Sequence, residues 1–340
     1  MLTLPALGQA AVDHGEATML LPQMNLHDPF ILAYAPTKTY YLYTSNVRQM
    51  TQVNRTGTMA YTSKDLKHWT APKVVFTVPE GFWAEDGGWA PEVHEYHGKF
   101  YLLTTIHNEK KEIVQKGRPV GHPTYMRGTI IAVSDSPDGP FVPVKSDGPI
   151  APADFMTLDG TLYVDRAGKP WMVYAHEWLQ ATDGKMEAVP LKDDLTGASG
   201  APISLFKASD APWIDAQAVP NARGSVYVTD GPELYRSKDG HLLMLWSSYE
   251  HLSEDDGDSH YVQTIARSAS GELKGPWIQL EPLVKQDSGH GMLFRTFDGQ
   301  LMMVLHRPFK RARGKLYEMK DAGDHLEVVK ERVDLDGDGQ

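Results

Sequence analysis

The sequence predicts an all-β fold, a β-propeller with five blades. Five short openings recur along the chain, and each is followed by a strand-like run, a turn and a second strand-like run. The spacing is roughly 60 to 70 residues, and each unit offers about four short strands, the content of one propeller blade. Segments with a helical period and helix caps are hard to find. The openings are 26–30, 89–92, 158–161, 229–232 and 289–291.

The first unit shows the pattern most clearly. Residues 29–34 and 40–44 are rich in aromatic and β-branched side chains, and a turn at 36–37 joins them as a hairpin. A third strand is expected at 59–63, with an exit turn that ends at Trp69.

The later units repeat the hairpin, and the second and fourth also repeat the third strand and its exit. A turn that contains glycine separates the first two strands in each of them. This constant order favours a propeller over the alternative, a β-sandwich whose hairpins are similar by chance. The strands expected are 92–96, 100–104 and 129–134 in the second unit, 161–164 and 171–175 in the third, 234–236, 242–246 and 265–268 in the fourth, and 292–295 and 301–305 in the fifth, with exits at 139–141 and 275–277.

We expect residues 1–340 to form a single domain. Residues 1–25 show no clear period and form an arm that wraps the body or lends it an edge strand. Residues 26–330 hold the five blades, and 331–340 form a tail. The tail resembles the start of an EF-hand loop but ends before the glutamate that such a loop requires, so we expect it to be solvated.

Composition excludes several classes of protein. The chain has 44 acidic and 33 basic residues and a net charge of −11, which argues against a nucleic-acid-binding surface. No apolar run approaches the ~20 residues of a membrane helix. The absence of cysteine excludes disulfides and cysteine-ligated zinc. The 8 tryptophans and 15 tyrosines suit a sugar-binding cleft, in which flat rings cover the apolar faces of sugars.

Three of the openings carry an aspartate. The innermost strands of a propeller begin around one central funnel, so we expect Asp28, Asp159 and Asp230 to meet near the axis at equivalent openings. Crowded carboxylates push their pKa values apart, which produces the acid and the base that inverting glycoside hydrolysis needs. A single aspartate before proline or glycine is more often only a turn residue, but three at equivalent openings weaken that interpretation.

The openings resemble those of glycoside hydrolase family 43, whose fold is a five-bladed β-propeller and whose mechanism is inverting. The resemblance covers about residues 26–310. It implies that Asp28 is the general base that activates water, and that Asp159 orients the acid and tunes its pKa. The motifs are, in chain order, His27-Asp28-Pro29, Trp89-Ala90-Pro91-Glu92, Leu158-Asp159-Gly160-Thr161-Leu162-Tyr163, Thr229-Asp230-Gly231-Pro232 and Gly289-His290-Gly291.

The general acid departs from the family pattern. In the family it is usually a glutamate that opens the fourth blade, two residues before a proline, and here that position holds Asp230. The shorter side chain reaches about one methylene less far into the funnel. Two other residues compete for the role: Glu177, at the end of a strand of the third blade, and Glu233, which lies farther down its strand.

His290 opens the fifth unit, and the resemblance implies a structural calcium or other cation beside it, bound largely through water. A hydrogen-bonded core histidine is the alternative, since calcium prefers oxygen ligands. No cofactor is expected to be required for the reaction. The expected substrate contacts are the aromatic and basic side chains at strand ends, namely His27, Trp89, His176, Trp178, Trp246 and Arg307, with Arg48 and Arg127 as further candidates.

Two classes of function follow. The first is an inverting glycoside hydrolase that removes terminal arabinofuranosyl, galactofuranosyl or β-xylosyl residues, with the loops 106–128 and 181–225 walling the pocket. The second is a carbohydrate-binding propeller without turnover, which the missing glutamate favours and the retained Asp28 and Asp159 oppose. The expected partner is an oligosaccharide or polysaccharide rather than nucleic acid or a membrane, and we expect a monomer.

The compartment stays open at this level. No charged start followed by a long apolar segment is visible, so the sequence shows no signal peptide. The protein is expected to be cytoplasmic, or periplasmic or secreted if a leader was removed.

Overall fold

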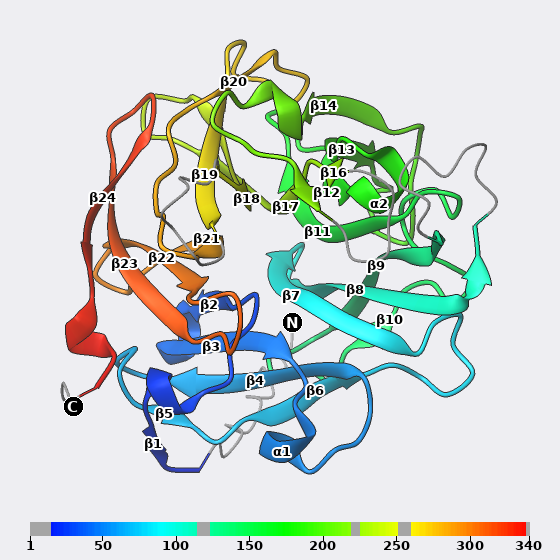
Figure 1. The fold of residues 1–340 in the computed structure, drawn as a ribbon. Coiled ribbons are helices and arrows are strands. Elements are labelled where there is room, and N and C mark those ends of the chain that lie inside the picture. The colour runs from blue at the N-terminus through cyan, green and yellow to red at the C-terminus, as the bar shows by residue number, and fades with distance from the viewer. Residues whose placement is uncertain (1–14, 114–122, 219–224, 251–259, 338–340) are drawn as a thin grey trace, which may run out of the picture.

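The computed structural model describes residues 15–113, 123–218, 225–250 and 260–337. Its strands form five main antiparallel sheets that radiate from a common axis, as Figure 1 shows. This is the five-bladed β-propeller that the sequence predicts. The innermost strand of each blade contains its opening motif or begins within it, and successive strands lie farther from the axis.

The strand bounds follow the predicted hairpins closely. In every blade the hairpin, the third strand and the outer strand come from one continuous stretch of chain. The strands are β1 (Ala17–Met19), β2 (Phe30–Tyr34), β3 (Thr39–Ser45), β4 (Gly57–Ser63), β5 (Trp69–Thr70) and β6 (Lys73–Thr77) in the first blade; β7 (Asp86–Tyr96), β8 (Lys99–Glu112), β9 (Tyr125–Ser134) and β10 (Val142–Pro143) in the second; β11 (Thr157–Val164), β12 (Pro170–His176), β13 (Lys185–Pro190) and β14 (Ile203–Lys207) in the third; β17 (Asp230–Arg236), β18 (Leu242–Tyr249), β19 (Tyr261–Ser268) and β20 (Trp277–Gln279) in the fourth; and β21 (Gly289–Arg295), β22 (Leu301–His306), β23 (Gly314–Asp321) and β24 (Leu326–Glu331) in the fifth.

The helices and turns outside the five sheets are short, and most of them join strands of the same blade. None of the helices in the described part of the chain has the length and hydrophobicity that a membrane-spanning helix requires. The remaining elements are α1 (Arg48–Thr51), α2 (Trp178–Ala181), the 3₁₀ turns η1 (Leu21–Gln23), η2 (Ala35–Thr37), η3 (Ala208–Asp210) and η4 (Val333–Leu335), and the two-stranded ribbon of β15 (Gln217–Ala218) and β16 (Ser225–Val226).

The second strand of each blade is buried on both faces. Every residue of β22 is buried, and its sequence, Leu-Met-Met-Val-Leu-His, shows no alternation of apolar and polar residues. The reason is geometric, because a blade is packed between two neighbouring blades and a middle strand therefore has no solvent-facing side. The hydrophobic clusters accordingly span pairs of blades; one of them joins Val173 of the third blade to Trp246 of the fourth.

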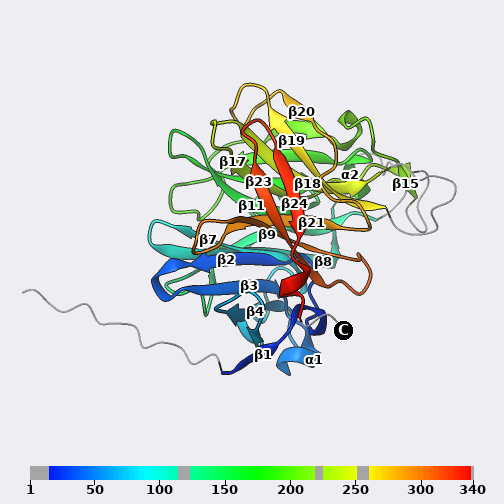
Figure 2. The same cartoon turned by 90° about the vertical axis from the view of Figure 1, so that its left-hand side faces the viewer.

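No sheet in the described residues combines strands from the two ends of the chain. The ring is therefore closed between the first and fifth blades by contacts across a seam, which Figure 2 shows edge-on with β2 and β3 beside β21 and β23. Tyr40 stacks on Phe297 at 4.3 Å between ring centroids, and its hydroxyl accepts a hydrogen bond from the Phe297 amide. The Leu26 amide donates to the Ala312 carbonyl across the same seam.

The two terminal segments also meet at the seam. β1 pairs with β5 at the edge of the first blade, which is one of the two arrangements expected of the arm, and residues 1–14 lie outside the described residues. The expectation that the tail is fully solvated is wrong. Leu335 is buried in the same cluster as Leu21, because that cluster extends past the last strand of the fifth blade.

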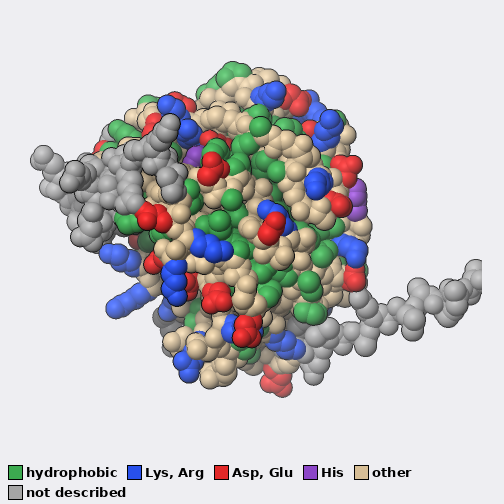
Figure 3. All heavy atoms as spheres, turned by 90° about the vertical axis from the view of Figure 1, so that its right-hand side faces the viewer, with side chains coloured by type: hydrophobic (Ala, Val, Ile, Leu, Met, Phe, Trp, Pro, Cys, Tyr) green, Lys and Arg blue, Asp and Glu red, His purple; other side chains and the backbone are tan. Residues whose placement is uncertain are grey.

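On the side of the molecule drawn in Figure 3, acidic and basic side chains are interspersed over the described surface. This mixed pattern agrees with the net charge of −11 and does not resemble the basic footprint of a nucleic-acid-binding surface.

Candidate active site

The inner strands of the second to fifth blades share an irregularity at the same place. Their pairing with the next strand shifts register between Trp89 and Glu92, and likewise in the three later blades. Within each shift one residue has a positive φ. The first blade has such a residue at its opening too, and the five are Asp28 (φ 48°), Ala90 (43°), Asp159 (54°), Gly231 (49°) and His290 (54°). These five positions are therefore equivalent.

This register corrects one expectation. Asp28 and Asp159 do occupy equivalent positions, but Asp230 comes one residue earlier in its blade than they do. Its pairing with Ser247 matches that of Leu158 with Ala175, so its counterparts are the residues before each positive-φ position. The motif Thr229-Asp230-Gly231-Pro232 was aligned on its aspartate, whereas the backbone aligns it on Gly231.

Adjacent blades hold these positive-φ residues in place. The Asp159 amide donates to Oγ1 of Thr105 at 2.8 Å, and the His290 amide donates to Oγ of Ser247 at 2.8 Å. The blade between them has Ala175 at the corresponding place and offers no side-chain acceptor. The Gly231 amide instead donates to Oδ2 of Asp159 at 3.2 Å.

The residues one step earlier surround a pocket at this end of the axis. Its volume is about 500 Å³. Four of the five blades contribute the residue before the positive-φ position, which explains how side chains from distant parts of the chain meet there. The lining consists of His27, Trp89, Leu158 and Asp230 from those positions, together with Asp28, Asp159, Ser45, Arg127, Glu177, Trp178 and Phe309.

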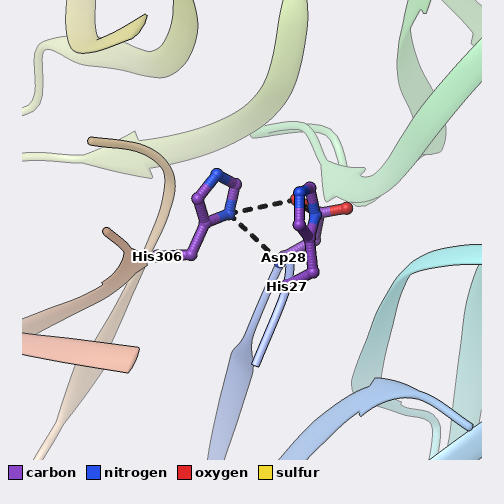
Figure 4. A group of neighbouring side chains, drawn as sticks. All are labelled: His27, Asp28 and His306. Carbon is purple, nitrogen blue, oxygen red and sulfur yellow. Dashed lines mark hydrogen bonds and ion pairs between the residues drawn. The ribbon is translucent and has the colours of Figure 1, made fainter. Parts of the chain in front are cut away.

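Three imidazoles surround one oxygen of Asp28. Its Oδ1 lies 2.9 Å from Nδ1 of His27, 3.2 Å from Nδ1 of His290 and 3.3 Å from Nδ1 of His306. Figure 4 shows His306 reaching both the carboxylate and the backbone of Asp28 from the fifth blade. No partner is recorded for Oδ2 among the described residues, so this oxygen is left for a water molecule or substrate.

These contacts set the charge of Asp28. Burial alone raises the pKa of its carboxyl, but the charges of His27 and His290 and a hydrogen bond with His27 hold that pKa well below its usual value. In return, the charge of Asp28 raises the pKa of His27 to about 9, against the effect of burial. Burial lowers the pKa of His306, so this histidine is neutral and can accept the Asp28 amide hydrogen at Nδ1.

Asp159 has the opposite electrostatic environment from Asp28, because its neighbour Asp230 is also a carboxyl group. Burial, the charge of Asp230 and a hydrogen bond to Asp230 raise the pKa of Asp159 well above its usual value. Both carboxylates and the His290 ring offer atoms that lie within 4.8 Å of one another. The neighbouring carboxylate thus favours a proton on Asp159, because two negative charges in a buried site repel each other.

Glu177 lies on the pocket wall in an ion pair. Its two oxygens lie 2.6 and 2.5 Å from Nη1 of Arg127, and both side chains are almost completely buried. The guanidinium of Arg127 in turn lies over the rings of Trp89 and Tyr125, 4.7 and 4.8 Å from their centroids. Both oxygens of Glu177 are thereby engaged by the guanidinium of Arg127.

Comparison with known proteins identifies the family. The family model described as "Glycosyl hydrolases family 43" matches residues 21–328. The chain belongs to this family. The match confirms the resemblance to this family that the sequence motifs indicate. Membership of the family implies a glycosidase activity.

Three known proteins illustrate what the chain is similar to. A solved structure titled as an endo-arabinase from Bacteroides thetaiotaomicron VPI-5482 is 37% identical with a TM-score of 0.77, and the match covers 92% of this chain and 100% of that chain. The extracellular exo-α-(1→5)-L-arabinofuranosidase of Cellvibrio japonicus (strain Ueda107) is 22% identical over 327 residues, 88% of this chain and 83% of that protein. An exo-1,5-α-L-arabinanase from a bovine ruminal metagenomic library shares the fold, with 17% identity and a TM-score of 0.62 over 90% of this chain and 97% of that chain.

Four of the residues predicted for this family-43 site, and the further candidate Arg48, lie outside the pocket. Trp246 is fully buried and packs against Phe206 in the core between blades, because its strand is the second of its blade. His176 stacks on Phe155 and contacts Glu187. The positions predicted for these two side chains are therefore wrong.

The other two are engaged elsewhere. Arg307 pairs with Glu331 of the outermost strand of its blade, at 2.8 Å, instead of facing the pocket. Glu233 accepts a hydrogen bond from the Leu293 amide at 2.7 Å and lines a separate cavity farther along the axis, so it does not reach the pocket. Glu233 is thereby removed from the candidates for the acid. Arg48 does not line the pocket, whereas Arg127 does.

Sequence reasoning missed four residues of the site, namely Ser45, Tyr261, His306 and Phe309. Two of them flank Arg307, which was chosen from the same segment for its charge. The end of β22 places His306 toward Asp28, and the chain turns back at Pro308 to bring Phe309 to the pocket. A strand-end histidine opposite a predicted catalytic aspartate is a signal that could have found His306.

The cation expected near His290 remains a prediction. The Nε2 atom of His290 is buried and has no hydrogen-bond partner among the described residues, which leaves room for a water ligand. Its Nδ1 faces Asp28 and Asp159 at 3.2 and 3.9 Å. His290 offers one nitrogen beside the carboxylates of Asp159 and Asp230. Calcium takes six to eight oxygen ligands, so water would have to complete the set, and we derive no catalytic step from an ion.

Proposed function

We propose that this family-43 enzyme hydrolyses α-L-arabinofuranosidic bonds with inversion of configuration and acts on terminal residues. The observation that carries the proposal is the pairing of opposite carboxyl environments in one pocket. Asp28 has a pKa held well below its usual value, whereas the pKa of Asp159 is raised well above it. An inverting glycosidase needs such a pair, one group to take a proton from water and one to give a proton to the leaving group.

The proposed reaction is a single displacement. Asp28 Oδ2 accepts a proton from a water molecule whose oxygen attacks the anomeric carbon from one side. On the other side the bond between the anomeric carbon and the glycosidic oxygen breaks, and that oxygen takes the proton held by the Asp159–Asp230 pair. Asp28 is then protonated and the pair ionised, and exchange with solvent restores both for the next turnover.

Asp230 is the better candidate for the residue that delivers the proton. It comes from the pocket-lining position of its blade and is more exposed than Asp159, which is 6% exposed. Glu177 lines the same pocket, but both of its oxygens accept from Arg127. A carboxylate whose charge is compensated by a guanidinium has little tendency to carry a proton to a substrate.

The names of the relatives support arabinose-containing substrates. The endo-arabinase at 37% identity and the exo-acting arabinofuranosidase at 22% identity differ in mode of attack, so the choice of terminal residues rests on the limited size of the pocket at the propeller axis, about 500 Å³. Trp89, Trp178 and Phe309 supply flat apolar walls for a single sugar ring there.

Product analysis tests the proposal. Debranched arabinan and linear arabino-oligosaccharides are incubated with the enzyme, together with nitrophenyl α-L-arabinofuranoside, β-D-galactofuranoside and β-D-xylopyranoside. Release of arabinose alone from the earliest time points, with the β-anomer first detected by NMR, is the expected result. Release of mixed oligosaccharides at early time points would show that the enzyme attacks internal bonds rather than terminal residues. Binding without hydrolysis on every substrate would overturn the enzymatic proposal in favour of a carbohydrate-binding propeller.

A further inference from the structure

The fifth blade lacks a side chain where the other four blades contribute one to the pocket wall. Its residue at that position is Gly289, which pairs with His306 just as Asp230 pairs with Ser247. The ring of Tyr261, from the third strand of the fourth blade, occupies the space. A Cβ atom at position 289 would lie 2.1 Å from Cε1 of Tyr261, so any side chain there would displace the ring.

From its position beside Gly289, Tyr261 binds the side chain of Asp230. Its hydroxyl donates a hydrogen bond to Oδ2 of Asp230 at 2.6 Å. Burial and the charges of Asp230 and Asp28 raise the pKa of Tyr261 well above its usual value, so the phenol stays protonated and acts as a donor.

The ring of Tyr261 is fixed on several sides. It stacks on His306 at 5.7 Å with an interplanar angle of 3°, and Phe309 and Tyr249 pack against it at 5.1 and 5.2 Å. The side chain is fully buried. Because the ring cannot move far, the position of its hydroxyl fixes the position of Asp230 Oδ2.

We propose that Tyr261 is the positioning residue of the general acid, and that it fixes the short side chain of Asp230 so that Oδ1 presents the proton to the glycosidic oxygen. The inference rests on the proposed role of Asp230. A carboxylic acid carries its proton on one oxygen, and a donor bound to the other oxygen decides which one that is. An aspartate is one methylene shorter than the usual acid of this family, so it depends more on a fixed orientation than a glutamate does.

The variant Tyr261→Phe tests this because it keeps the ring and removes only the hydroxyl. An acid matters most for a poor leaving group. On arabinobiose, kcat should fall about 10-fold to 100-fold, the effect expected of a misplaced catalytic group. On an arabinofuranoside with a dinitrophenyl leaving group, kcat should change less than about 3-fold. The alkaline limb of the pH profile should also move to higher pH, since a donor to the ionised pair has been lost.

Tyr235→Phe is the matched control, because this phenol of the same blade also donates to an aspartate, Asp321, but lies outside the pocket. This variant should leave kcat on both substrates unchanged. If Tyr261→Phe does not fold, Gly289→Ala offers a second route, since the added methyl displaces the ring while keeping the phenol, and it should show the same dependence on leaving group.

An equal loss of kcat on both substrates with an unchanged pH profile would mean that Tyr261 is only structural, and no loss on either would overturn the inference as well. Asp230→Asn separates this failure from a failure of the proposed function. If that variant depends on the leaving group and Tyr261→Phe does not, the acid assignment stands and the positioning role falls. If Asp230→Asn shows no such dependence, the acid assignment itself is wrong.

Discussion

The backbone amide of Asp28 donates a hydrogen bond to Nδ1 of His306, a residue 278 positions later in the chain. The bond crosses the seam between the first and fifth blades, and it fixes an aspartate whose φ is +48°. The proposed catalytic base is therefore held by the two ends of the sequence together. Its orientation depends on closure of the ring as well as on its own blade.

Asp28→Asn should lower kcat by about 10²-fold to 10⁴-fold, the usual contribution of a general base. Asparagine is the suitable replacement because it tolerates a positive φ, so the fold should be retained. Rates on a nitrophenyl arabinofuranoside and thermal melts check both statements. Asp298→Asn, in an exposed turn, is the control and should keep full activity. A loss of less than about 10-fold in Asp28→Asn would contradict the assignment of the base.

His27→Gln should move the acidic limb of kcat/KM to higher pH. Burial raises the pKa of Asp28 and the charge of His27 counteracts it, so removal of that charge lets the pKa rise. The wild-type profile should stay flat down to low pH, because Asp28 is ionised there. A pH profile of kcat/KM between pH 3 and 9 measures the shift, and an acidic limb that does not move would show that His27 is not the dominant charge.

Asp159→Asn should remove activity yet raise stability at neutral and alkaline pH. The pKa of Asp159 is raised on folding, so between its usual and its raised value the folded state binds more protons than the unfolded state. The wild-type protein consequently loses stability as pH rises through that window. Asparagine, which cannot ionise, avoids this loss. Thermal melts of both proteins between pH 4 and 9 should diverge as pH rises, and parallel curves would contradict the raised pKa.

Arg127→Met should destabilise the protein by about 3–5 kcal/mol, because it leaves Glu177 buried without its cation.

Glu177→Gln should instead reduce the turnover of substrates with good and with poor leaving groups by the same factor, since the pair shapes the pocket wall and does not deliver the proton. Denaturant unfolding and the two-substrate comparison check these statements. If Glu177→Gln spares only the activated substrate, Glu177 and not Asp230 is the acid.

Tyr40→Ala should weaken the seam. Tyr40 is buried, stacks on Phe297 and accepts its amide hydrogen, so its truncation should cost about 3–5 kcal/mol of unfolding free energy. Activity should be lost at a lower temperature than secondary structure, because the Asp28–His306 bond crosses the same seam. Val142→Ala, at an exposed edge, is a control that should change neither. Simultaneous loss of activity and circular dichroism would argue against a separate opening of the seam.

The sequence alone was sufficient for the fold and for part of the site. Hairpins can be predicted from local sequence because their turn residues are characteristic; His97 and Gly98, for example, both take a positive φ. The recurrence of openings then places Asp28 and Asp159 at one end of the axis. Both conclusions use information that lies within a few residues of each motif.

The errors came where a position depends on pairing between strands or blades. The one-residue offset of Asp230 follows from the irregular register of the inner strands, which short motifs do not encode. Trp246 faces a neighbouring blade because β18 is a middle strand. The pair of Arg127 with Glu177 joins two adjacent blades and depends on their packing. The bond from Asp28 to His306 joins the first and fifth blades, and only the closed ring brings these two residues together.

Each blade is built from one continuous stretch, and the two ends of the described chain lie together, with Gly337 against the side chain of Leu20. The order of blades in the sequence is therefore not dictated by their order in space. A circular permutant that joins the present ends by a flexible linker and opens the chain beside the exposed Asp147, between the second and third blades, should form the same ring. In that protein Asp159 and Asp230 would precede Asp28 in the sequence. The catalytic rate should be the same as in the original chain.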